Sequence, residues 1–138
     1  MAMTCELCIP ADESLLWQGL HCRVILVEDD DYPGFCRVIW NEHIKEMTDL
    51  SPAMRNELMN TVFAVELAVR EVMNPEKINL ASLGNMTPHL HWHVIPRYLD
   101  DKNFPNPVWG AAVRNSRISK NEEMRDRLSA HIHTKLTA

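Results

Sequence analysis

The chain has 138 residues, of which 46% are hydrophobic and 24% are charged, and its formal net charge at pH 7 is −5. These values fit one globular domain with its own core, and the acidic balance argues against a general nucleic-acid binder. The apolar runs are shorter than the roughly 20 residues of a membrane span, and the start of the chain lacks the pattern of a secretion signal. We therefore expect one cytoplasmic domain over residues 1–138 that binds neither nucleic acid nor membranes.

Alternating and continuous apolar runs predict several short β-strands. Residues 1–14 lack such a pattern and are expected to form an irregular N-terminal arm. β-Branched and aromatic residues bounded by turn residues indicate the strands. We expect strands at Leu15–Trp17, Cys22–Val27, Phe35–Trp40, Ile78–Leu83 and from Pro88 to Pro96. The short connections between them favour an antiparallel sheet.

Two segments show the spacing of amphipathic helices. Ser51-Pro52 combines an N-cap residue with proline at the first helical position, and Asn74-Pro75 is expected to end this helix of about six turns. A capping box that begins at Ser119 predicts a C-terminal helix over residues 119–138. The sequence therefore predicts an α+β fold, with an antiparallel sheet of about five strands, one long helix and a C-terminal helix.

The segment from Pro88 to Arg97 carries three histidines at alternate positions. Successive side chains of a strand point to opposite faces, so a strand here places His89, His91 and His93 on one face. Neighbouring Cα atoms in this set are then about 6.6–6.8 Å apart. Three such rings can surround one small anionic group.

Imidazole is well suited to covalent chemistry at phosphorus. With an ordinary pKa of about 6.5, a neutral ring can attack an electrophile near pH 7. The central ring, His91, is placed to attack while its neighbours bind phosphate oxygens. A covalent intermediate divides one difficult displacement into two easier ones. The nitrogen that does not attack must be held, most simply by a backbone carbonyl that fixes the tautomer.

Two other interpretations of the histidines remain open at this point. One is a set of surface or core histidines on an edge strand. The other is catalytic zinc, which often takes three protein ligands and water. The outer two residues lie about 13 Å apart on a straight strand, which makes binding of one ion by all three difficult.

The segment His89–Ile95 resembles the His-φ-His-φ-His-φ-φ signature of the histidine triad (HIT) superfamily, where φ is an apolar residue. The extension Pro96-Arg97 is similar to its Fhit-like and bacterial members. Upstream, Pro33–His43 resembles the family strand that reads roughly Pro-Gly-His-x-Leu-Val-Ile-Pro-x-x-His. The resemblance implies a HIT-like homodimer that hydrolyses or transfers at the α-phosphate of purine nucleotides. The implied substrates are nucleoside phosphoramidates or dinucleoside polyphosphates.

The resemblance also implies roles for individual residues. His91 is the expected nucleophile that forms a nucleotidyl-histidine intermediate, and His93 is expected to contact the phosphate and assist the leaving group. His89 would orient the site or bind a metal. No cofactor is required for this chemistry, although a divalent metal can accompany a polyphosphate substrate. The alternative function is a nucleotide-binding sensor or interaction module with vestigial turnover.

The chain departs from the family pattern where the substrate binds. The usual Gly-rich loop with Gln-Ser or Gln-Thr is replaced by Gly84–Thr87, in which Asn85 or Thr87 could donate to phosphate. The ribose-binding group is expected at Glu28 or Asp29. Two further candidates each have an alternative. Arg97 either neutralises phosphate, or is a solvated charge or a partner to Asp100 or Asp101. Trp109 either closes over a base or a dimer partner or packs in the core.

Cys5-x-x-Cys8 has the spacing of a metal-binding pair. A closed tetrahedral site needs two more ligands, and family members with this pair imply His43 and His89. A structural zinc site at these four residues is therefore one possibility. The other is two unligated thiols in the N-terminal arm. Cys22 and Cys36 lie in apolar strands and are expected in the core.

Overall fold

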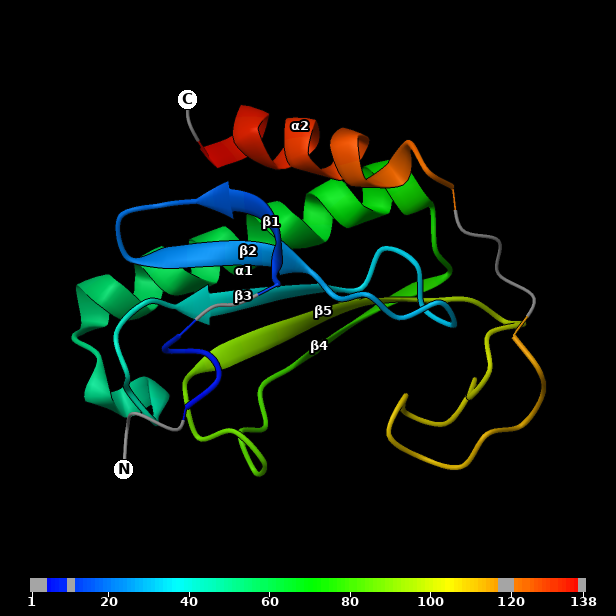
Figure 1. Cartoon of the computed structure of the whole chain (residues 1–138), viewed down its shortest axis with the longest axis horizontal. Helices are drawn as coiled ribbons and strands as arrows, with labels where there is room; N and C mark the ends of the chain where they lie inside the picture. The colour runs from blue at the N-terminus through cyan, green and yellow to red at the C-terminus, as the bar shows by residue number, and fades with distance from the viewer. Residues whose placement is uncertain (1–4, 10–11, 117–120, 137–138) are drawn as a thin grey trace.

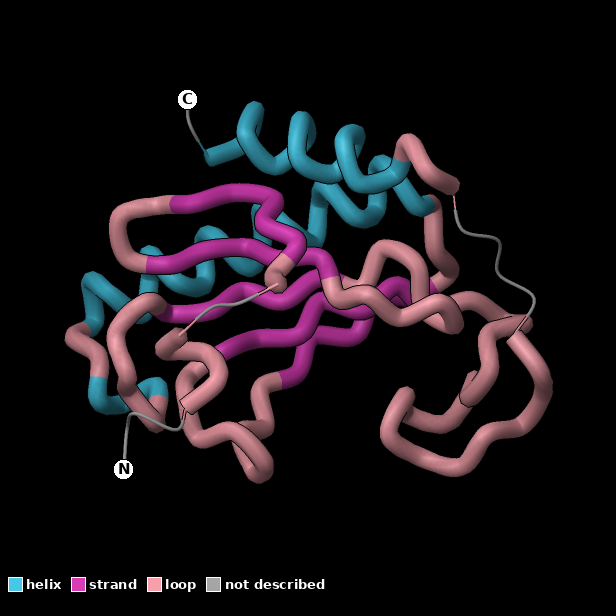
Figure 2. The backbone as a smooth tube through the Cα atoms, viewed as in Figure 1, coloured by secondary structure: helices cyan, strands magenta, loops and turns pink. Residues whose placement is uncertain are grey.

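The computed structural model describes residues 5–9, 12–116 and 121–136, which form a five-stranded antiparallel sheet and two α-helices (Figures 1 and 2). The strands lie in the order β1-β2-β3-β5-β4. Their bounds are Ser14–Gln18 (β1), Cys22–Leu26 (β2), Cys36–Trp40 (β3), Lys77–Ala81 (β4) and His91–Arg97 (β5). The predicted α+β fold class with an antiparallel sheet is confirmed.

Helix α1, Pro52–Met73, has the predicted start and end. The Ser51 side chain accepts a hydrogen bond from the backbone N–H of Met54, and Asn74 takes the left-handed conformation with φ of 49°. An N-cap oxygen and a left-handed residue satisfy the free backbone groups at helix ends. The predicted apolar stripe is buried at Leu58, Thr61, Val62, Val65, Ala68 and Val69.

Helix α2, Met124–Leu136, packs against α1 and β1 through Met124, Leu128 and Ile132, which are buried. The predicted cap at Ser119 lies outside the described residues. A short 3₁₀ helix at Met47–Asp49, labelled η2, was not expected from the sequence. Neither α-helix in the described part of the chain is long and apolar enough to cross a bilayer.

Strand β5 differs from the prediction at both ends. It begins at His91, so His89 precedes it, and it includes Pro96, which was expected to close it. Pairing of β5 with β3 ends at Cys36↔Val94, and the Arg97 carbonyl accepts from Glu76 on the β4 side. Because hydrogen-bonding direction alternates along a strand, Pro96 faces the side where β3 has already ended. Its missing N–H therefore interrupts no ladder, which is why proline is tolerated here.

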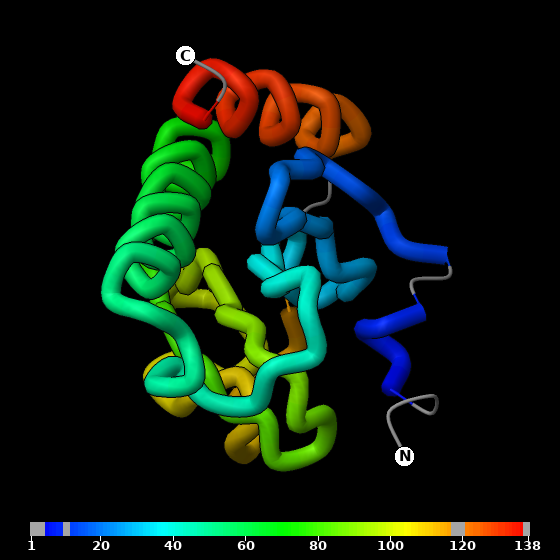
Figure 3. Tube along the Cα trace, turned by 90° about the vertical axis from the view of Figure 1, so that its left-hand side faces the viewer, coloured from blue at the N-terminus to red at the C-terminus, as the bar shows by residue number. Residues whose placement is uncertain are grey.

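The two faces of the sheet are covered differently. The helices bury one face in the main core, with Val24, Val38 and Val94 from the sheet packed against α1 and α2. On the other face, the N-terminal arm places Leu7 over Ile25 and Ile39. Figure 3 shows the arm and α1 on opposite sides of the strands. Since loops alone cover the second face, it can hold open cavities beside the histidines.

Candidate active site

The register of the sheet sets the position of the two histidines in β5. His91 pairs with Ile39 of β3, and His93 pairs with Arg37. Directly opposed residues share a face, and this face is the one turned away from the helices. Between them, Trp92 packs against the main core on the other face. His91 and His93 are therefore neighbours on one wall, with exposed fractions of 7% and 6%.

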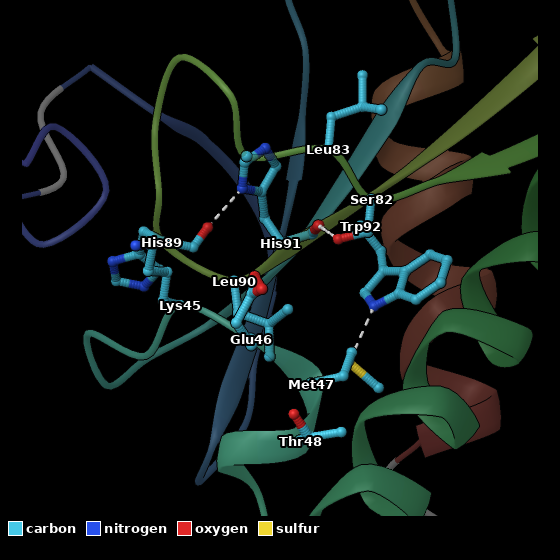
Figure 4. Close-up of a pocket in the computed structure, with 11 residues that line it drawn as sticks. Lys45, Glu46, Met47, Thr48, Ser82, Leu83, His89, Leu90, His91 and Trp92 are labelled. Carbon is cyan, nitrogen blue, oxygen red and sulfur yellow. Dashed lines mark hydrogen bonds between the residues drawn. The ribbon is translucent and has the colours of Figure 1, made fainter.

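The His91 ring is held by the backbone, as predicted. Its Nδ1 lies 2.6 Å from the carbonyl oxygen of His89 (Figure 4). A carbonyl can only accept, so Nδ1 carries the proton and Nε2 keeps its lone pair. Burial lowers the pKa of His91 from its ordinary value, which keeps the ring neutral near pH 7. The Ser82 hydroxyl donates to the His91 carbonyl over 2.7 Å and fixes this end of β5.

His93 lies in an aromatic cluster with three edge-on neighbours. Its ring centroid is 4.9 Å from that of His91, 5.0 Å from Trp109 and 5.6 Å from Phe35. Burial, together with the charges of Arg37 and His91, lowers the pKa of His93 to about 4. The free protein therefore holds His93 neutral at pH 7. Its Nδ1 is buried without a hydrogen-bond partner among the described residues.

His89 belongs to a second cluster. Its Nε2 lies 2.6 Å from the Trp40 carbonyl, and its Nδ1 lies 3.5 Å from the sulfurs of both Cys5 and Cys8. His43 Nδ1 is 3.1 Å from Cys8 Sγ, and ligand atoms of all four side chains lie within 4.8 Å of one another. With Nε2–H donating to Trp40, the Nδ1 lone pair faces the thiols. This donor set suits tetrahedral zinc.

Two cavities meet at His91. The first, about 370 Å³, is lined by Lys45, Glu46, Thr48 and Trp92 as well as by His91 (Figure 4). The second, about 420 Å³, lies on the side of His93 and Trp109. His91, Leu83 and Gly84 line both. His91, the expected nucleophile, therefore lies between two cavities that can hold the two parts of a substrate on either side of the reacting phosphorus.

The loop before β5 forms the rim of the second cavity. Asn85 and Thr87, both predicted substrate-binding residues, line it. The Thr87 hydroxyl donates to a Glu6 carboxylate oxygen over 3.0 Å, which joins this loop to the N-terminal arm. Gly84 has φ of +76°, a conformation that glycine adopts without strain. The position of Asn85 and Thr87 fits their predicted role, which stays a prediction.

The acidic candidates for ribose binding lie elsewhere. Glu28 and Asp29 are exposed, and neither lines the two cavities that His91 shares. One Asp29 carboxylate oxygen accepts from the backbone N–H of Asp31 over 3.0 Å, a local turn contact. The predicted role of Asp29 therefore gains no support from its position.

Of its predicted alternatives, Arg97 takes the pairing with Asp101. It is 3% exposed, and its Nε and Nη2 donate to the Asp101 carboxylate over 2.9 and 3.2 Å. Further donations go to Asn79 over 2.7 Å and to the Asn106 carbonyl over 2.6 Å. Its guanidinium is thus committed within the protein, and it lines neither cavity at His91. The phosphate-binding role assigned to Arg97 does not fit this arrangement.

Sequence reasoning missed Arg37 as a site residue. It lines the second cavity beside His91 and His93. A signal was available, because a charged residue stood in the strand Phe35–Trp40, which is otherwise apolar, and charged residues are seldom buried without a partner. Trp109 had two predicted alternatives. The structure leaves it 53% exposed beside His93, which removes core packing and leaves a position at the cavity.

Comparison with known proteins agrees with the geometry. The profile of the HIT domain matches residues 11–100. An "AP-4-A phosphorylase" from Mycobacterium tuberculosis is 29% identical over 87 residues, which cover 59% of this chain and 45% of that protein. A "Bis(5'-nucleosyl)-tetraphosphatase [asymmetrical]" from Schizosaccharomyces pombe is 26% identical over 88 residues, covering 60% and 48%. The chain therefore matches about half the length of these curated relatives.

A solved structure matches over nearly the whole chain. The crystal structure of a histidine triad protein from Sinorhizobium meliloti superposes with a TM-score of 0.72 at 30% identity, covering 91% of this chain and 90% of that one. The family match spans more than half of the chain and includes the histidine segment. On these grounds the chain belongs to the HIT family.

Proposed function

We propose that this protein is a nucleotidyl hydrolase or transferase that acts at the α-phosphate of purine nucleotide derivatives. One observation carries the proposal: His91 Nδ1 is held by the His89 carbonyl, so that Nε2 presents its lone pair in a neutral ring between two cavities. The curated relatives, by their names, act on dinucleoside tetraphosphates. That likeness supports a phosphate anhydride as the bond that is broken, while the phosphoramidate rests on the family resemblance alone.

The reaction has two displacements. In the first, the Nε2 lone pair of His91 forms a bond to the α-phosphorus, and the bond from phosphorus to the leaving group breaks with its electron pair on the leaving group. In the second, water or another acceptor attacks phosphorus, the P–N bond breaks and its electron pair returns to Nε2. The acceptor loses a proton in this step, which His93 Nδ1 or Nε2 could relay.

Neutral His93 acts differently in the free and bound states. With a pKa of about 4 in the free protein, the His93 ring is neutral before substrate binds and first meets the phosphate as an N–H donor. An anionic substrate beside the ring favours the protonated form and raises its pKa. His93 can then deliver a proton to the departing group, which is the role expected from the sequence.

We also propose a structural zinc site at Cys5, Cys8, His43 and His89. Two thiols and two imidazole nitrogens within 4.8 Å of one another make a donor set that fits zinc. When bound there, the ion would tie the N-terminal arm to the residue whose carbonyl holds His91. It supplies no step of the reaction. The homodimer expected from the family remains a prediction, which light scattering in solution can test.

The test is release of AMP from diadenosine tetraphosphate and from an adenosine phosphoramidate. We expect His91→Ala to lower the rate by at least about 10³-fold, since removing a covalent nucleophile costs several kcal/mol and each 1.4 kcal/mol is about tenfold. His131→Ala, an exposed histidine of α2 paired with Glu71, is the matched control and should keep full activity. Mass spectrometry of quenched wild-type protein should reveal an adenylyl adduct on His91.

Two outcomes would contradict the proposal in different ways. Normal turnover by His91→Ala would refute the role of the nucleophile. Tight nucleotide binding with no turnover by the wild-type protein would favour the sensor or interaction module instead.

A further inference from the structure

Three arginines lie on the histidine face of the sheet, and two of them are fully engaged within the protein. Arg23 donates to both Glu13 carboxylate oxygens over 2.9 and 2.8 Å and to the Leu7 carbonyl over 2.8 Å. Arg97 has the Asp101 pairing described above. Arg23 thus fixes the N-terminal arm and Arg97 fixes the loop after β5, so both charges are used to stabilise the fold.

Arg37 is the third, and its hydrogen-bonding groups have no such partners. Its Nε is buried without a hydrogen-bond partner, and none of the described residues forms an ion pair with it. Glu6 lines the same cavity but lies beyond ion-pair distance, with its carboxylate occupied by Thr87. The side chain as a whole is only partly buried, but a buried N–H without an acceptor is costly. A ligand that supplies a hydrogen-bond acceptor to Arg37 would explain why its Nε–H has no partner within the described part of the protein.

The position and chemistry of Arg37 indicate which kind of ligand it can bind. It stands directly opposite His93 in the β3–β5 register and lines the 420 Å³ cavity. In the rough family strand pattern quoted above, leucine stands at the corresponding place, so this charge is not part of that pattern. The planar fork of arginine matches two oxygens of a phosphate group. Arg37 therefore lies on the same side of the site as His93, the residue expected to assist the leaving group.

We propose that Arg37 binds a phosphate of the leaving group and so makes the site prefer, of the two substrate classes that the family resemblance implies, the dinucleoside polyphosphates over the phosphoramidates. This inference rests on the proposed function. The leaving group of a phosphoramidate is an amine, which offers Arg37 no anionic oxygen. A polyphosphate offers several, and when the bond to the α-phosphorus breaks, the electron pair remains on the bridging oxygen of the departing chain. Arg37 stabilises the negative charge that develops there.

The experiment compares kcat/KM for diadenosine tetraphosphate and for an adenosine phosphoramidate. In Arg37→Leu, we expect the ratio of the two to fall by about 10- to 100-fold, the range for loss of a charged hydrogen bond. Arg37→Lys keeps the charge but not the fork and should fall between. Arg70→Ala, an exposed arginine at the end of α1, is the control and should leave the ratio unchanged. An equal loss on both substrates, or an unchanged ratio, would overturn the proposal.

A binding measurement separates this proposal from the proposed function. Calorimetric titration with inorganic tripolyphosphate needs no turnover, and Arg37→Leu should weaken its binding about tenfold or more. If the wild-type protein turns over neither substrate, the proposed function fails, while the effect of Arg37 on tripolyphosphate binding still decides the anion site. Equal binding by both proteins would refute it. Because apolar replacement of a partly buried charge is often tolerated, the variant should fold; Arg37→Gln provides a second variant, uncharged but polar.

Discussion

Removal of the Asp101 carboxylate should weaken the fold strongly. The side chain is fully buried and accepts hydrogen bonds from Arg97 Nε and Nη2. Backbone N–H groups of Tyr98 and Phe104 also donate to it, over 3.0 and 2.8 Å. Burial alone would raise the pKa of this carboxyl, but the hydrogen bonds and the charge of Arg97 hold it below its ordinary value. The carboxylate is therefore ionised and balances a buried cation.

The size of the effect follows from what Asp101→Ala leaves behind. Breaking a buried ion pair from one side costs about 3–5 kcal/mol, because the remaining charge is buried without a partner. In urea, with an m value near 2 kcal/mol/M, the unfolding midpoint should fall by about 2 M. Asp126→Ala, at an 89% exposed side chain, should change the free energy of unfolding by less than about 0.5 kcal/mol.

A double variant tests the reasoning further. Arg97→Met combined with Asp101→Ala removes both charges, so it should be more stable than Asp101→Ala alone. If Asp101→Ala costs less than about 1 kcal/mol, or if the double variant loses the sum of the two single effects, then the pair does not hold this loop as described.

Three other predictions concern acid, metal and backbone strain. The pKa of His93 is about 4 in the folded protein and 6.5 ordinarily, so stability should be lost as pH falls from about 6.5 towards 4. At pH 5 the loss from this histidine should be about 2 kcal/mol. Urea unfolding of His93→Gln at pH 7 and pH 5 should show a smaller loss. A zinc chelator should lower the melting temperature of the wild-type protein; elemental analysis should find the metal lost in Cys8→Ser and retained in Cys22→Ser, whose thiol lies in the core. Gly34→Ala should cost about 1–3 kcal/mol in urea, since φ is +88° and the new Cβ would lie 2.7 Å from the side chain at the end of α1; an effect below 0.5 kcal/mol would contradict this.

Helix α1 was predictable to the residue because its signals are local. Ser51-Pro52 and Asn74-Pro75 act on the backbone of their immediate neighbours, so their effect does not depend on the rest of the fold. The position of His91, the proposed nucleophile, was predictable for a related reason. Alternation alone places His91 and His93 on the same face, and a carbonyl two residues away can fix the ring.

The remaining features depend on long-range contacts. Strand β5 begins at His91 and not before His89, because the His89 ring bonds to the Trp40 carbonyl and contacts Cys5 and Cys8. These cysteines lie more than 80 residues away in the sequence. The sequence marks Arg37 only as a charge in an apolar strand and leaves several partners open for Arg97. Only the packed structure shows that Arg97 meets Asp101 while Arg37 meets a cavity.

His89 contributes two different parts of itself to two different tasks. Its ring lies among the cysteines, whereas its main-chain oxygen holds His91. Any amino acid at this position brings the same oxygen, but only a few bring a donor for a metal. The proposed zinc ion and the proposed nucleophile therefore depend on different atoms of one residue, so relatives with and without the cysteine pair are compatible with one chemistry.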